Sequence, residues 1–282
     1  MRVLVTGAAG QLGRDLVAEL DRLRTVEVTG AGRKDLDVSD RDMVMTAVNG
    51  LRPDVIVHAA AWTAVDGCET DPERAFKVNS LGTRNIAEAA RFFGSHVCYV
   101  STDYVFDGRA GRAYVEWDQP NPLSVYGRSK LGGELELDPG STVVRTSWVC
   151  GAHGSNIVRT VLELASRGQT LRFVDDQWGC PTFTPGLASK ITLLALERRA
   201  GVYHVTHQGP TSWYGFVQAI LEAAGQPVSL VQPIKTAELD PPRPAPRPAY
   251  SVLDNAAMRL SGLELLPEWH EPLGDLVKAL KG

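Results

Sequence analysis

The chain opens with the run V-L-V-T-G-A-A-G-Q-L-G over residues 3–13. Consecutive apolar residues predict a buried strand, and leucines at every third or fourth position from Leu12 to Leu23 predict a helix after it. The glycines between them have the spacing G-x-x-G-x-x-G, which lets backbone approach a pyrophosphate at the helix N-terminus. The sequence therefore predicts a dinucleotide-binding loop rather than a purely structural turn. Its cofactor-binding residues are Gly7, Gly10, Gln11, Leu12 and Gly13.

Strand and helix patterns alternate along the rest of the chain. Parallel strands need a crossover between them, so this alternation predicts an α/β fold with a doubly wound parallel sheet of the Rossmann type. We expect a dinucleotide-binding domain over residues 1–150 and a smaller C-terminal α/β substrate domain over 151–282, with later segments returning to the first. The expected strands are 3–5, 26–28, 55–57, 97–100, 142–144, 171–174 and 202–205, and the expected helices are 11–23, 43–48, 72–90, 157–165, 187–196 and 213–223.

Composition excludes several classes of protein. The 29 basic and 33 acidic residues give a net charge of −4, without the basic excess of a nucleic-acid-binding protein. Apolar runs are shorter than the ~18 residues of a membrane span, and the N-terminal run does not resemble a signal peptide. The four cysteines are widely spaced, which predicts reduced thiols in a cytoplasmic protein. His204 and His207 have no third residue at a metal-binding spacing, so no metal site is predicted.

The choice of dinucleotide depends on residues about 20 positions after the glycine loop. Arg33 stands there, and a guanidinium can bind a 2′-phosphate through two hydrogen bonds. This favours NADPH. Asp35 and Asp37 leave NADH open, because either carboxylate could accept hydrogen bonds from a ribose.

A second motif concerns proton transfer. Tyr126 and Lys130 are four residues apart, so a helix would present both on one face. We expect the ammonium to lower the pKa of the phenol and to hold the cofactor ribose. Thr102 and Asp103 follow the strand that ends at Val100, and ligands of such sheets bind beyond the strand ends. Thr102 is therefore predicted to bind a substrate carbonyl, and Asp103 a water or a sugar hydroxyl.

These motifs resemble those of the extended short-chain dehydrogenase/reductases, and among them the dTDP-4-dehydrorhamnose reductase family. The resemblance extends over nearly the whole chain, and S-T-D-Y-V-F-D-G is its most specific string. The matching segments are residues 5–13, 59–66, 78–79, 101–108, 122–130, 145–149, 176–182 and 247–253.

The resemblance implies hydride transfer from NADPH to C4 of a dTDP-linked 4-keto-6-deoxy sugar, dTDP-4-dehydro-L-rhamnose, by a monomer or homodimer. The implied catalytic residues are Thr102, Tyr126 and Lys130. The cofactor would also contact Arg33, Asp37, Val38, Ala60, Ala61, Thr63, Tyr126 and Lys130. The substrate would contact Thr102, Asp103, Tyr104, Trp148, Asn156, Gln177, Thr182 and Arg247.

Three alternatives stay open at the level of sequence. Trp178 and Cys180 depart from the residues that are frequent in the family, which leaves room for a different dTDP-4-keto-deoxysugar. A non-catalytic NADP-binding regulatory subunit, similar to the β-subunit of methionine adenosyltransferase, would share the fold. An epimerase would keep NAD tightly bound.

The proline-rich segment 241–248 predicts a stiff extended loop.

Overall fold

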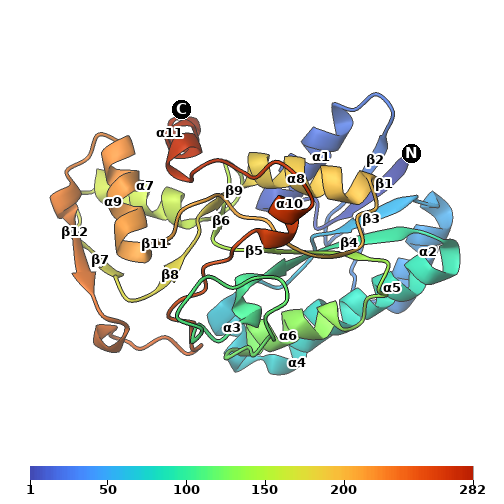
Figure 1. Ribbon diagram of the computed structural model, residues 1–282, viewed down its shortest axis with the longest axis horizontal. Helices are drawn as coiled ribbons and strands as arrows, with labels where there is room; N and C mark the ends of the chain where they lie inside the picture. The colour runs from blue at the N-terminus through green and yellow to red at the C-terminus, as the bar shows by residue number, and fades with distance from the viewer. Residues whose placement is uncertain (282) are drawn as a thin grey trace.

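A computed structural model describes residues 1–281, and residue 282 of the expected second domain lies outside the described part. Its centre is a six-stranded sheet in the order β10-β5-β4-β3-β1-β2, in which all pairs are parallel (Figure 1). This confirms the doubly wound α/β fold. The strands are β1 (Arg2–Thr6), β2 (Glu27–Ala31), β3 (Val55–His58), β4 (His96–Thr102), β5 (Thr142–Thr146) and β10 (Gly201–His204).

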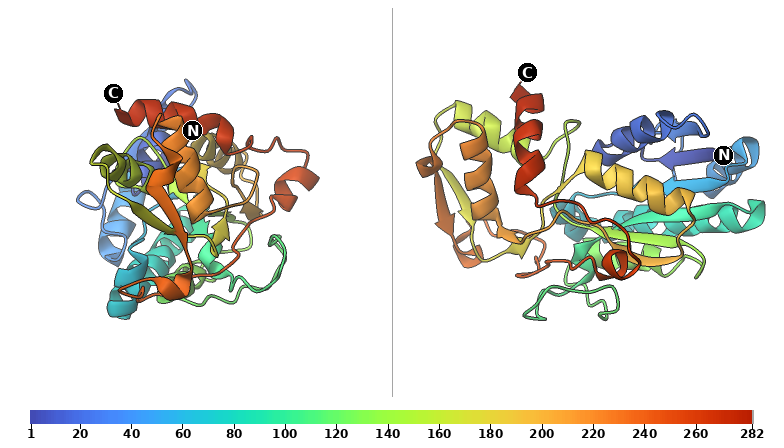
Figure 2. Two further views of the ribbon diagram at one scale, coloured as in Figure 1. Left: turned by 90° about the vertical axis from the view of Figure 1, so that its left-hand side faces the viewer. Right: turned by 45° about the horizontal axis from the view of Figure 1, so that its top comes forward.

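Helices cover both faces of this sheet (Figures 1 and 2). One face holds α1 (Gln11–Asp21) and α8 (Thr184–Leu196), and the other holds α2 (Arg41–Leu51), α5 (Gly82–Phe93) and α6 (Val125–Glu134). Side chains alternate along the strands accordingly: Val3 and Val5 pack on the α1–α8 side, whereas Leu4 packs on the α2–α5 side. The continuous apolar runs seen in the sequence therefore belong to strands that are buried on both faces.

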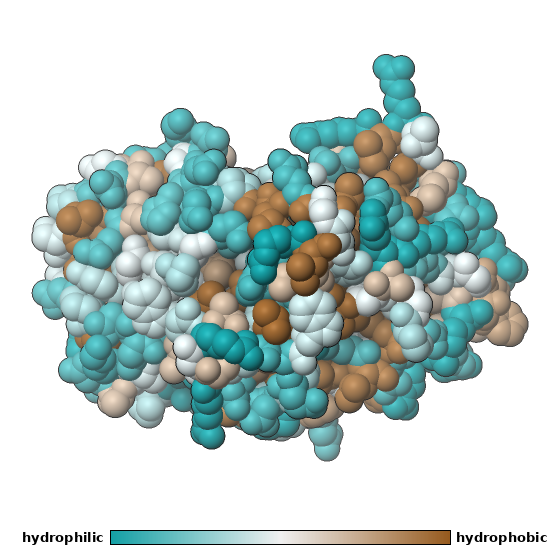
Figure 3. Space-filling view, viewed as in Figure 1, coloured by the Kyte–Doolittle hydropathy of each residue, from teal (hydrophilic) through white to brown (hydrophobic). Residues whose placement is uncertain are grey.

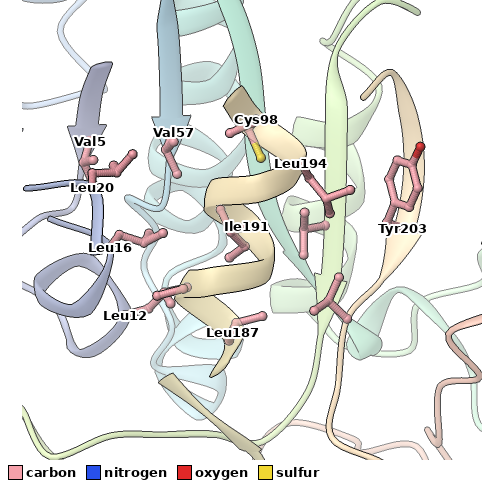
Figure 4. Packing of buried hydrophobic residues seen from close by; sticks show 14 of the residues in the cluster. Val5, Leu12, Leu16, Leu20, Val57, Cys98, Leu187, Ile191, Leu194 and Tyr203 are labelled. Atoms are coloured by element: carbon pink, nitrogen blue, oxygen red, sulfur yellow. The ribbon is translucent and has the colours of Figure 1, made fainter. Parts of the chain in front are cut away.

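The core between α1 and α8 fixes the start of the dinucleotide-binding loop. Leu12, Leu16 and Leu20 of α1 pack with Ile191 and Leu194 of α8, above the apolar residues of the central strands (Figure 4). The leucines of α1 are three or four residues apart because that spacing places them on one helical face. Their burial anchors α1, so its N-terminus is held directly after β1.

A smaller lobe lies beside the sheet and has its own apolar core (Figure 1). In it, β7 (Leu171–Val174) pairs in parallel with β12 (Val231–Ile234), and α7 (Ile157–Ser166), α9 (Trp213–Ala223) and α11 (His270–Lys281) pack around them. We propose to keep the domain division at residue 150. The segments that return include α8, β10 and α10 (Ala256–Leu260), which pack on the first sheet or its edge.

Short elements complete the chain. They are α3 (Val65–Thr70), α4 (Pro72–Phe76), η1 (Lys77–Leu81), η2 (Asp103–Val105), β6 (Val149–Cys150), β8 (Trp178–Gly179), β9 (Thr182–Phe183), β11 (Thr211–Ser212), η3 (Val228–Leu230), η4 (Thr236–Glu238) and α10 (Ala256–Leu260). The proline-rich segment 241–248 forms neither helix nor strand, as its composition predicts. All four cysteines are buried and free.

The expected single helix over 72–90 is wrong in its middle. A π-helical turn, η1, separates α4 from α5. Asn79 lies in this turn, and its side chain accepts a hydrogen bond from the backbone N–H of Trp62 at 2.8 Å and donates to Ser129 at 2.9 Å. Such turns occur frequently at functional sites, and this one ties the segment after β3 to α6.

Most apolar residues lie inside the protein, and the surface is mainly hydrophilic. On the face drawn in Figure 3 hydrophilic residues predominate, and hydrophobic ones gather near its middle. Within residues 1–281, none of the helices combines the length and the apolar character needed to cross a membrane.

We expect Leu194→Ala to lower the free energy of unfolding by about 2–5 kcal/mol, because it removes a fully buried side chain between α8 and the sheet. The matched control is Leu260→Ala, whose side chain is 73% exposed and whose effect should stay within about 0.5 kcal/mol. Urea unfolding of both variants measures the difference. Equal losses would contradict the assignment of this core.

Candidate functional site

A cavity of about 580 Å³ opens at the carboxyl ends of the central strands. The loops after β1, β3, β4 and β5 all contribute to its lining. Parallel strands bring their carboxyl ends to one edge of the sheet, so residues from distant parts of the sequence meet there. The lining residues fall into a glycine loop, an arginine-containing loop, an aromatic wall and the group predicted to be catalytic, Thr102, Tyr126 and Lys130.

The glycine loop is shaped by backbone contacts that leave no room for side chains. Gly7 has a φ of +71°, and a Cβ on it would lie 2.7 Å from the backbone nitrogen of Ala60. A Cβ on Gly13 would lie 2.2 Å from the carbonyl oxygen of Gly7. Gly10 caps α1 without a side-chain hydrogen bond, so the first N–H groups of the helix face the cavity free of side-chain partners. This is the cradle that a pyrophosphate requires.

A buried hydrogen-bond chain supports the floor of this cradle. Thr6 Oγ1 accepts from the Ala60 N–H at 3.3 Å and shares a 2.7 Å hydrogen bond with Nδ1 of His58. Burial, with a smaller contribution from nearby Lys130, lowers the pKa of His58 to about 3, so the imidazole is neutral at physiological pH. These hydrogen bonds fix the spacing between β1 and β3, and the glycine loop passes beside them.

The residues predicted to discriminate between the two dinucleotides lie on the loop after β2. Arg33 lines the cavity and forms no salt bridge among residues 1–281, although, after the hydrogen bonds from Ser39, its charge helps to lower the pKa of Asp37 on the same loop. Asp35 accepts from the Gly32 N–H at 2.9 Å, and Asp37 accepts from the N–H and hydroxyl of Ser39 at 3.0 and 2.8 Å. Both carboxylates are thus engaged within the loop. The arrangement favours a ligand with a phosphate beside Arg33 over one that needs a free carboxylate.

Thr102, Tyr126 and Lys130 line the same cavity, and all three are buried. The Lys130 ammonium donates to the carbonyl of Val100 at 2.7 Å and lies 4.0 Å from the centre of the Tyr99 ring. Burial lowers its pKa to about 7, while Glu134 one turn further along α6 acts in the opposite direction.

The expectation that Lys130 lowers the pKa of Tyr126 is wrong for this structure. Burial raises the pKa of the phenol, and a hydrogen bond with Thr102 opposes this only in part. The ammonium is directed at the Val100 carbonyl and the Tyr99 ring instead. Tyr126 therefore keeps its proton at physiological pH, which is the state in which it can donate.

Asp103 completes this group and is itself buried. Its Oδ1 accepts from the Thr102 hydroxyl at 3.0 Å, and its Oδ2 accepts from the Ser251 hydroxyl at 2.5 Å. Burial raises the pKa of this carboxyl to about 6, although both hydrogen bonds work against the shift. Ser251 comes from the far end of the chain, so the C-terminal segment contacts the catalytic group.

An aromatic wall closes the cavity on the side of the smaller lobe. Trp148 stacks on Trp213 with ring centres 3.6 Å apart and an angle of 10°. Trp148 has a φ of +46°, a strained conformation for a bulky residue, and a Cβ on Gly179 would lie 2.6 Å from its ring. The structure thus holds this tryptophan in a conformation that presents it to the cavity.

The predicted residues separate into two sets. All thirteen predicted cofactor-contacting residues line the cavity, as do Thr102, Asp103, Tyr104 and Trp148 of the substrate set. Four others lie outside the lining, and their side chains have protein partners: Asn156 bonds Gln11, Gln177 bonds Thr236, Thr182 bonds the Cys180 carbonyl and Arg247 pairs with Asp66. The ligand contacts of both sets stay predictions.

The Arg247 pair joins the proline-rich segment to the cavity rim. Its guanidinium donates to both carboxylate oxygens of Asp66, at 3.0 and 2.9 Å, and Arg243 lies 3.3 Å from the same carboxylate. These contacts lower the pKa of Asp66 to about 2, so the pair is charged at physiological pH. Asp66 lies in the first turn of α3, directly after the loop from β3.

Two tryptophans that were not among the predicted site residues line the cavity. Trp62 follows β3, with the Arg74 guanidinium 4.3 Å from its ring centre, and Trp213 forms the aromatic wall. The position of Trp62 beside Ala60 and Ala61, just after a strand, was a usable signal. For Trp213 there was none, because its partner Trp148 is distant in sequence. Within residues 1–281, no cluster of three His, Cys, Asp or Glu side chains could hold a metal ion.

The chain resembles known proteins over its full described length. A family model described as the RmlD substrate binding domain matches residues 1–281. A dTDP-4-dehydrorhamnose reductase of Streptomyces griseus is 42% identical over 290 residues, which cover 100% of this chain and 94% of the relative. A dTDP-4-keto-6-deoxy-D-glucose reductase of Streptomyces niveus is 40% identical, with 95% and 93% of the two chains covered.

A solved structure supports the same relation. The dTDP-4-dehydrorhamnose reductase of Bacillus anthracis, in complex with NADP, is 36% identical, matches with a TM-score of 0.93 and covers 98% of both chains. The identity of the relatives, the span of the family model and the match in fold all agree. This chain therefore belongs to the RmlD family of dTDP-4-dehydrorhamnose reductases.

Proposed function

We propose that this chain reduces the C4 keto group of dTDP-4-dehydro-L-rhamnose with NADPH and so forms dTDP-L-rhamnose. The observation that supports this most directly is the cavity itself. A pyrophosphate cradle, a buried phenol that keeps its proton and a buried lysine all line one space. Membership of the reductase family gives the same activity from an independent direction.

The residues of the chain divide the work of such a reduction. NADPH supplies a hydride, which adds to C4 and turns the carbonyl into an alkoxide. Thr102 and Tyr126 donate hydrogen bonds to that oxygen, and Tyr126 then transfers its proton to give the alcohol. Lys130 holds the ribose of the cofactor, whose binding site its amine borders.

The binding of the sugar nucleotide extends beyond the cavity. Trp148, supported by Trp213, offers an aromatic face on which an apolar sugar face can pack. We propose that Arg247 binds the diphosphate, with Asp66 holding the guanidinium in place through one edge. The nucleotide end would be held by Asn156, Gln177 and Thr182. For this, each side chain must replace its hydrogen bond within the protein by one to the ligand.

A second sugar nucleotide is an alternative substrate to dTDP-4-dehydro-L-rhamnose. The Streptomyces niveus relative is named for a different substrate, dTDP-4-keto-6-deoxy-D-glucose, at similar identity. A regulatory subunit is disfavoured because the catalytic group is intact and lines an open cavity. We propose that the chain acts in the cytoplasm, where NADPH and nucleotide sugars are available, as a monomer or homodimer.

The activity is tested by mixing the protein with NADPH and dTDP-4-dehydro-L-rhamnose and following oxidation of the cofactor. We expect turnover, and we expect Tyr126→Phe to lower kcat by about 10²–10⁴-fold, because it removes the general acid. Parallel assays with dTDP-4-keto-6-deoxy-D-glucose compare the two sugars. Absence of oxidation with both would refute the reductase assignment, and an unimpaired Tyr126→Phe would refute the mechanism.

Arg33→Ala tests the choice of cofactor. Loss of a charged hydrogen bond to the 2′-phosphate costs about 1.5–3 kcal/mol, so we expect KM for NADPH to rise by about 10- to 100-fold and KM for NADH to change little. The control is Arg24→Ala, an exposed arginine outside the cavity. A variant that affects both cofactors equally would argue against phosphate recognition by Arg33.

Gly13→Ala tests the cradle, because its Cβ would be forced against the Gly7 carbonyl. We expect the loop to shift and the affinity for NADPH, measured by nicotinamide fluorescence, to fall by about tenfold or more. Gly274→Ala in α11 is the matched control, since its Cβ would meet nothing within 4 Å. Unchanged binding in Gly13→Ala would show that the cofactor lies elsewhere.

A further inference from the structure

The hydroxyl proton of Thr102 can be donated to only one acceptor. A threonine hydroxyl has one proton to donate and two lone pairs. Thr102 Oγ1 accepts from the backbone N–H of Tyr104 at 3.2 Å and shares a 3.0 Å hydrogen bond with Oδ1 of Asp103. If Asp103 is ionised, that second bond must use the Thr102 proton, and none remains for a ligand.

A protonated Asp103 reverses this bond. Oδ1–H then donates to Thr102, while Oδ2 continues to accept from the Ser251 hydroxyl at 2.5 Å. Thr102 uses both lone pairs, for Tyr104 and Asp103, and its proton can point into the cavity that all three residues line, toward Tyr126 or toward a ligand oxygen that takes its place. The mechanism proposed above needs a donor at that place.

We propose that Asp103 works as a carboxylic acid, which donates to Thr102 and thereby directs the Thr102 proton at the C4 oxygen of the keto sugar. Asp103 is then a positioning residue, since it acts through Thr102, and not the sugar-hydroxyl ligand that the sequence suggested. Ser251 fixes the second oxygen of the carboxyl and so determines which one faces Thr102. The inference rests on the proposed function.

The surroundings of Asp103 shift its carboxyl toward the protonated form. Its side chain is 2% exposed, and burial raises the pKa of the carboxyl to about 6. The titratable groups that face it are Tyr104, Tyr126 on α6 and Cys180 before β9, and burial raises the pKa of each, that of Cys180 to about 11. They are uncharged near neutrality, and a bound substrate that excludes water favours the protonated carboxyl further.

Infrared spectroscopy tests the protonation state without relying on turnover. The difference between wild type and Asp103→Asn should contain the band of a protonated carboxyl, which disappears as the pH rises through about 6. Ser251→Ala removes a hydrogen bond that stabilises the carboxylate, so it should move this midpoint to higher pH. A midpoint at the ordinary aspartate pKa of ~3.9 would overturn the proposal.

Kinetics tests the direction of the hydrogen bond. In Asp103→Asn the amide N–H replaces the acid O–H as donor to Thr102, and the amide oxygen can accept from Ser251. The ratio of kcat/KM, variant over wild type, should therefore rise by about tenfold per pH unit above pH 6. Lys130, whose pKa is lowered to about 7, titrates in the same range, but the ratio cancels its effect because both proteins contain it.

The outcomes separate this proposal from the function on which it rests. A ratio that stays constant between about pH 5 and about pH 8, with turnover intact, would overturn the role of Asp103 and leave the reductase standing. Absence of turnover at every pH would remove the proposed function, and the infrared titration would still report whether Asp103 is protonated.

Discussion

The approach of two backbones at the end of β1 is the constraint on which the site depends. Gly7 and Gly13 bring the loop so close to the segment after β3, and to itself, that a Cβ at either position would meet backbone atoms. The hydrogen bonds of Thr6 with His58 and Ala60 hold that spacing from below. Because α1 begins immediately afterwards, its N-terminal N–H groups face the cavity without any charged side chain from the loop.

Burial then determines the protonation of the catalytic group. It keeps the proton on Tyr126, raises the pKa of Asp103 to about 6 and lowers that of Lys130 to about 7. All three shifts favour the neutral form of the side chain, because buried groups in the cavity are poorly solvated when charged. A reduction ends with a proton delivered to an oxygen, so an environment that keeps the proton on the Tyr126 phenol suits this direction of the reaction.

Much of this arrangement was predictable because it is local in sequence. The glycine spacing, the Tyr126–Lys130 spacing and the strand before Thr102 each lie within a few residues, and the regular geometry of helix and strand converts them into positions. The contacts that sequence reasoning missed join distant segments: Asp66 with Arg247, Asp103 with Ser251, and Trp148 with Trp213. The sign of the shift at Tyr126 was missed for a related reason, since burial is a property of the whole fold.

The pairing of β10 with β5 has a consequence for the order of assembly during synthesis. The strand at this edge is formed by residues 201–204, so the first 150 residues leave the ribosome as a sheet with one side of β5 unpaired. Until β10 docks, that side is a template for other extended chains. A nascent chain stalled between these points should be prone to aggregation and should depend on chaperones for protection.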